Sequence, residues 1–138
     1  MTVQLKGSPT AAGLRSAFTS EAEAAVRLLY FARRADIEGR ADISSVLRAV
    51  AEGEMGQAFG HLELLEEAED PISGGGDSVG NVVAFIASER ETAETTYPDL
   101  ARQARSDGFT DIADWFDSLA TAEQSHAGQL NRFRPKPA

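Results

Sequence analysis

Hydrophobic residues recur at intervals of three and four along most of the chain, which is the period of an amphipathic helix. Four such stripes can be traced, over residues 14–32, 43–68, 82–100 and 112–133. Ser8, Pro9 and Thr10 precede the first stripe, and Gly39 and Gly108 interrupt the chain after the first and third, as expected at helix boundaries. The glycine-rich stretch 69–80 is typical of a linker. The pattern predicts an all-α fold: an antiparallel four-helix bundle built from two helical hairpins joined by that linker.

One proline falls inside a predicted helix. Pro98 lies within the third stripe, and we expect it to kink the helix near residue 97 because proline has no backbone N–H to donate. The length of 138 residues suits a single domain. We therefore predict one domain over residues 1–134, followed by a short tail over residues 135–138.

Each stripe carries a glutamate near its middle, at a position where the pattern calls for an apolar residue: Glu21, Glu54, Glu89 and Glu123. An unpaired buried carboxylate costs several kcal/mol, so four of them facing one another require protonation or a bound cation. A divalent metal would meet that requirement. The alternative is a stripe assignment shifted by one residue, which would place these acids on a solvated face.

His126 follows Glu123 by three residues, so both side chains lie on one face of the predicted fourth helix. A Glu-x-x-His pair, with a lone Glu from each of two other helices, is the arrangement of carboxylate-bridged di-metal sites. When residues 39–57 are laid on residues 108–126, Glu54 coincides with Glu123 and Gln57 with His126. The two halves resemble an internal repeat, and the first half has an amide where the second has an imidazole.

Two further features of the second stripe stay open. His61 lies seven residues after Glu54, about 10 Å along a helix axis, so we do not expect it to bind the same metal. We expect it to pack in the core or at the bundle end, and the alternative is a role in supporting a metal ligand or at the entry to the site. Gly53, Gly56 and Gly60 indicate either a close approach of another helix or subunit, or a helix that tolerates weak helix formers.

Composition excludes several classes of function. With 22 Asp and Glu against 13 Lys and Arg, the formal net charge is −9, which disfavours nucleic acid and anionic membranes as partners. No apolar run approaches the roughly 18 residues of a membrane helix, and residues 1–10 do not resemble a signal peptide, so we predict a cytoplasmic protein. There is no cysteine, which excludes disulfides, thiolate metal sites and thiol nucleophiles. A metal must be held by carboxylates and imidazoles, ligands that suit iron and manganese.

These residues together resemble the rubrerythrins, the ferritin-like di-iron proteins. The similarity extends from Leu5 to Leu130. Residues 17–32 are similar to the family's first-helix signature, with Glu21 at its ligand position, and residues 51–54 to the start of its second-helix motif. Ser88-Glu89 through Tyr97-Pro98, and then residues 108–126, resemble its third and fourth helices.

The resemblance implies a ferritin-like bundle with two irons per chain, manganese being an alternative metal. It implies a catalytic centre with Glu54, Glu123 and the phenol of Tyr97, and these metal ligands: Glu21, Glu54, Glu89, Glu123 and His126. The chain departs from the family pattern at Gln57, where the family has His, and at Thr92, where it has a second Glu. We therefore expect one of the two metal sites to be weak.

The implied function is that of an oxidoreductase of oxidative-stress defence, a peroxidase reducing hydrogen peroxide or a ferroxidase oxidising ferrous iron with dioxygen or peroxide. Without cysteines for a rubredoxin-type iron, electrons must come from an external donor such as a rubredoxin-like protein. We also expect a homodimer. The alternative, favoured by Gln57 and Thr92, is a degenerate bundle that binds one metal or none and serves as a binding or assembly module.

Overall fold

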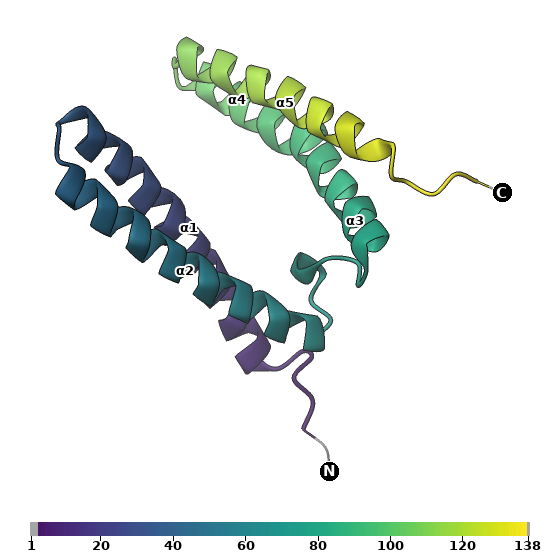
Figure 1. The fold of residues 1–138 in the computed structure, drawn as a ribbon. Helices are drawn as coiled ribbons and strands as arrows, with labels where there is room; N and C mark the ends of the chain where they lie inside the picture. The colour runs from purple at the N-terminus through teal and green to yellow at the C-terminus, as the bar shows by residue number, and fades with distance from the viewer. Residues whose placement is uncertain (1–2, 138) are drawn as a thin grey trace. The chain divides into compact units, whose positions relative to one another are not determined.

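The computed structural model describes residues 3–137, and within that range the chain forms helices and no strand (Figure 1). It divides into two compact units, Met1–Ser73 and Gly74–Ala138. The first contains α1 (Pro9–Ile37), α2 (Ala41–Glu67) and the short 3-10 helix η1 (Pro71–Ser73). The second contains α3 (Ser78–Glu91), the π-helical segment η2 (Thr92–Thr96), α4 (Tyr97–Ser106) and α5 (Thr110–Asn131). The predicted all-α fold, with two helical hairpins and a glycine-rich connection, is confirmed.

The helix boundaries follow from local capping chemistry. The Ser8 hydroxyl accepts a hydrogen bond from the Ala11 backbone N–H at 3.1 Å, which fixes the start of α1 where the sequence predicts it. Asp77 caps α3 in the same way, accepting from the Gly80 N–H at 2.7 Å. Because of this cap, α3 begins at Ser78, so the linker is shorter than the stretch 69–80 predicted from the sequence.

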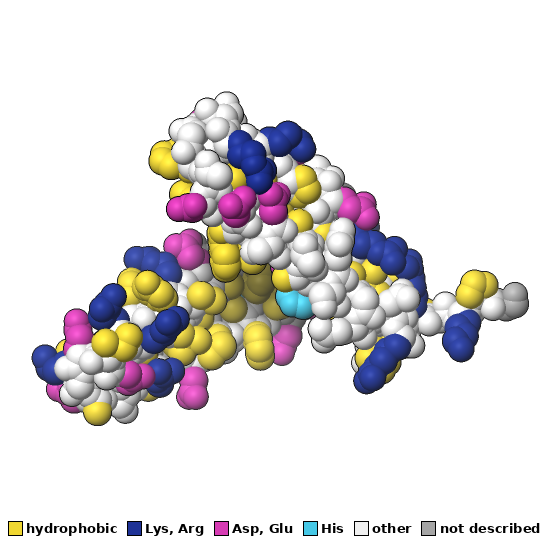
Figure 2. All heavy atoms as spheres, turned by 90° about the horizontal axis from the view of Figure 1, so that it is seen from above, with side chains coloured by type: hydrophobic (Ala, Val, Ile, Leu, Met, Phe, Trp, Pro, Cys, Tyr) yellow, Lys and Arg dark blue, Asp and Glu magenta, His cyan; other side chains and the backbone are white. Residues whose placement is uncertain are grey.

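Alanine dominates the contact between the helices of the first hairpin. The residues of α1 and α2 that are most buried are small, with one large exception, Leu65. Larger apolar side chains lie at the surface, among them Val26 and Phe59, and Figure 2 shows hydrophobic side chains interspersed with charged ones. Small side chains allow the two helix backbones to approach closely. Of the described helices, none has a stretch long and apolar enough to span a membrane.

The second hairpin contains an irregularity that the sequence pattern did not predict. We expected an interruption at Pro98, and the structure has a π-helical turn over Thr92–Thr96 immediately before α4, with Pro98 in the first turn of α4. The buried stripe is offset by one residue from the predicted one, and the offset is already present before this turn, where Ile86 is 1% exposed and Phe85 is 52% exposed. Ala101 is buried in place of Leu100, which is 41% exposed.

The glycines of α2 offer a test of helix stability. A Cβ atom added at Gly53, Gly56 or Gly60 would meet no other described atom within 4 Å, so nothing in the described residues requires glycine there. We expect Gly60→Ala to raise the free energy of unfolding by about 1 kcal/mol, as alanine is the better helix former, measurable by urea denaturation. Gly39→Ala is the control and should destabilise, since Gly39 has a φ of +72°. A loss of stability in Gly60→Ala would show that another surface packs closely on this helix face.

Candidate metal centre

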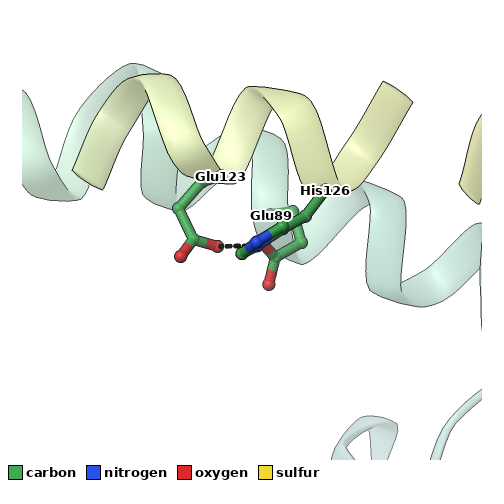
Figure 3. Close-up of side chains that lie close together, drawn as sticks. All are labelled: Glu89, Glu123 and His126. Carbon is green, nitrogen blue, oxygen red and sulfur yellow. Dashed lines mark ion pairs between the residues drawn. The ribbon is translucent and has the colours of Figure 1, made fainter. Parts of the chain in front are cut away.

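Three potential metal ligands converge within the second hairpin. Glu89 comes from the last turns of α3, and Glu123 and His126 come from α5. One ligand atom from each side chain lies within 4.8 Å of the others. Figure 3 shows the three side chains pointing toward one another. The sequence predicted all three as ligands, and the structure places them together in one group.

The burial of Glu89 is unusual for a charged side chain. Glu89 is only 9% exposed, and its Oε2 atom has no hydrogen-bond partner among the described residues. His126 Nδ1 lies 3.4 Å from that atom and 3.9 Å from Glu123 Oε2. A buried carboxylate oxygen without a hydrogen-bond donor is costly, and a bound cation would offset that cost.

The local sequence explains how the helices hold these side chains. Glu123 and His126 are three residues apart on α5 and therefore share one helix face. Ile86, which is 1% exposed, precedes Glu89 by the same interval on α3 and marks the buried face of that helix. Because α3 packs on α5, the two buried faces bring Glu89 to the Glu123–His126 pair.

The donor set fits a divalent first-row metal. Two carboxylates and one imidazole offer oxygen and nitrogen ligands, a combination that suits iron and manganese. Two negative charges would compensate a divalent cation within a partly buried site. Within the group, the His126 side chain is 54% exposed, against 11% for Glu89 and 17% for Glu123.

The other two predicted ligands, Glu21 and Glu54, belong to the first hairpin. Glu21 on α1 and Glu54 on α2 lie within hydrogen-bond reach, and this bond to Glu21, together with partial burial and the negative charge of Glu21, raises the pKa of Glu54 above its usual value. With its amide nitrogen facing the acceptors, Gln57 donates to Glu21 Oε2 at 2.7 Å and to Glu21 Oε1 at 3.3 Å. The carboxylates of the first hairpin therefore bond to each other and to an amide.

Thr92 is the first residue of the π-helical turn, and Tyr97 follows its last residue. The Thr92 hydroxyl donates to the Ser88 carbonyl at 2.9 Å, so it bonds to its own helix. The Tyr97 ring stacks on Phe116 of α5, with 6.0 Å between ring centroids. Phe116 lies two helical turns before Glu123 on α5. The catalytic roles expected for Tyr97, Glu54 and Glu123 stay predictions.

The contact between Gln57 and Glu21 is the feature that sequence reasoning missed. From the sequence, Gln57 marks only a missing imidazole. Its spacing of three residues from Glu54, on the same face of α2, was the available signal that it would meet the carboxylates. His61 is half-buried on the same helix, and its role also stays a prediction.

The fold and the triad of Glu89, Glu123 and His126 define a class of protein: an all-helical protein with a carboxylate–histidine group suited to a metal ion. The sequence model of the Rubrerythrin family matches residues 81–136, which include the triad. Rubrerythrin-1 of Clostridium acetobutylicum is 31% identical over 137 residues, which covers 92% of this chain and 70% of the relative. Rubrerythrin of Nitratidesulfovibrio vulgaris is 33% identical over 135 residues, covering 94% of this chain and 71% of the relative.

A third relative, rubrerythrin of Clostridium perfringens, is 30% identical over 139 residues, covering 94% of this chain and 70% of the relative. The chain belongs to the rubrerythrin family. The predicted resemblance is thus confirmed, and with it the ferritin-like four-helix class of the fold.

Proposed function

We propose that this protein is an iron-binding oxidoreductase of rubrerythrin type, which reduces hydrogen peroxide or oxidises ferrous iron. The observation that carries the proposal is the buried Oε2 atom of Glu89, which has no hydrogen-bond partner among residues 3–137 and lies within reach of Glu123 and His126. Family membership supports iron as the metal, with manganese as the alternative. Electrons would come from a donor outside these 138 residues, such as a rubredoxin-like protein, because the residues contain no cysteine to hold a rubredoxin-type iron.

Each residue of the triad has a distinct part in this proposal. Bound iron would supply one-electron redox chemistry. The Glu89 and Glu123 carboxylates would hold it and compensate its charge from the buried side. His126, the most exposed of the three side chains, would bind through one neutral ring nitrogen, and peroxide or dioxygen would approach beside it. Reduction of hydrogen peroxide to water consumes two electrons and two protons, which the donor and solvent would supply.

Other parts of the proposal come from the sequence prediction and the family. We propose a cytoplasmic homodimer acting in oxidative-stress defence, without nucleic acid or membrane as partner. A second iron, with Glu21, Glu54 and Glu123 as ligands, is what the family resemblance implies, and the contacts of Glu21 within the first hairpin bear directly on it.

Metal analysis tests the proposal. We expect protein loaded anaerobically with Fe(II) and then desalted to retain iron, and His126→Ala to retain less than a tenth of that amount. His61→Ala makes the same substitution in the other hairpin, outside the triad, and should retain iron like the wild type. The reduced, loaded protein should also consume hydrogen peroxide. Retention of neither iron nor manganese under any loading condition would refute the proposal.

A second candidate function is a binding or assembly module with one metal or none. Thr92 and Gln57 favour it, because their side chains bond within the protein where the family supplies metal ligands. Iron retention without consumption of peroxide and without oxidation of added ferrous iron would support this candidate.

A further inference from the structure

The two hairpins treat their carboxylates differently. In the second hairpin Glu89 Oε2 is buried and has no hydrogen-bond partner within the described part of the chain. In the first hairpin the Gln57 amide faces both carboxylate oxygens of Glu21, at 2.7 and 3.3 Å, and it donates to both when its nitrogen is assigned to that side, as the two acceptors require. Among the described residues, the group in the second hairpin has a buried oxygen with no hydrogen-bond donor and His126 Nδ1 at 3.4 Å, whereas the group in the first hairpin has an amide donor beside its carboxylate.

The internal repeat makes this difference informative. Gln57 occupies the position that His126 occupies in the second half, three residues after the matching glutamate. A neutral imidazole offers a nitrogen lone pair to a metal, whereas the amide nitrogen of Gln57 is a donor only and offers none. To bind an ion, the amide would have to turn its oxygen inward and give up both hydrogen bonds to Glu21.

We infer that Gln57 excludes a transition-metal ion from the first hairpin, so that each chain binds one ion, held by Glu89, Glu123 and His126. The inference rests on the proposed function, since it assumes that the triad binds metal. It identifies Gln57 as the residue that sets the number of metal ions: its amide keeps Glu21 as a hydrogen-bond acceptor. Glu21 and Glu54 then form a polar cluster without metal in the wild-type chain.

Manganese titration followed by electron paramagnetic resonance counts the bound ions directly and needs no turnover. We expect the wild type to saturate at one Mn(II) per chain, and anaerobic Fe(II) loading to give the same number. Gln57→His supplies an imidazole and Gln57→Glu an isosteric carboxylate. Both remove the amide donor, and both should raise the number to two. Gln103→His adds a histidine to an exposed position on α4 and should leave it at one.

The outcomes separate this inference from the proposed function. A wild-type chain that binds two ions with similar affinity would overturn the inference and leave the proposed function standing. A wild-type chain that binds none would refute the proposed function itself. If the wild type binds one ion and both folded Gln57 variants also stay at one, the amide is not what excludes the metal, and the inference fails. Far-ultraviolet circular dichroism establishes that the variants are folded, and either variant alone suffices for the test.

Discussion

Replacing Glu89 with glutamine is expected to reduce the affinity of the second hairpin for iron or manganese by at least about 100-fold, while the metal-free protein remains as stable as the wild type or becomes more stable. The loss follows because an amide cannot supply the anionic ligand, and exchange of even an indirect partner of a metal ligand costs 10–100-fold in affinity. The stability follows because the substitution removes a negative charge that is buried without a hydrogen-bond partner at Oε2.

Thermal denaturation with and without metal measures both parts of this prediction. A ligand at a free concentration of about 100 times its dissociation constant stabilises the folded state by about 2.7 kcal/mol, and the variant should lose that increment. Glu91→Gln, two residues away and exposed at the end of α3, is the matched control and should keep it. A metal-free variant that is clearly less stable than the wild type would show that Glu89 has a structural partner instead.

Ile86→Ala should lower the free energy of unfolding by about 2–5 kcal/mol, the range for removing a buried isoleucine side chain. Ile86 is 1% exposed and is the large apolar side chain on the buried face of α3. Leu65 is the corresponding large buried side chain of the first hairpin. Because Ile86 lies one turn before Glu89, the cavity should also loosen the helix that carries Glu89 and weaken metal binding. Urea denaturation of the metal-free protein measures the first effect, and metal titration the second.

Ile37→Ala provides the control for this substitution. The chemical change is identical, but Ile37 is 68% exposed at the end of α1, so the expected cost is within about 0.5 kcal/mol. Equal losses of stability in the two variants would contradict the burial of Ile86 and the exposure of Ile37.

Much of this architecture can be predicted from local chemistry in the sequence. The period of the apolar stripes and the hydroxyl of Ser8 fix the helices, and turns at Gly39 and Gly108 follow from their left-handed backbone, with φ of +72° and +87°. Glutamates at apolar positions pointed to Glu89 and Glu123, and a spacing of three residues added His126. These features depend on residues that are near one another along a single helix, and sequence spacing is therefore enough to predict them.

Other features depend on contacts that sequence spacing does not specify. The amide orientation of Gln57 is set by the two oxygens of Glu21, a residue on another helix. The burial of Ile86 and Ala101 in place of their neighbours Phe85 and Leu100 depends on which face of each helix packs on α5, which the apolar period alone does not decide. The sequence therefore predicts which residues are available as ligands, while their hydrogen-bond partners emerge only from the packing of one helix on another.

The convergence of the metal ligands depends on the number of residues in the π-helical turn. Each residue advances an α-helix by about 100° around its axis, so removing one residue between Thr92 and Thr96 would turn Glu89 through about that angle relative to α4. Evolution can gain or lose such a turn through the insertion or deletion of a single codon. A descendant that lost one codon here would retain Glu89, Glu123 and His126 in its sequence, yet no longer direct them to a common point.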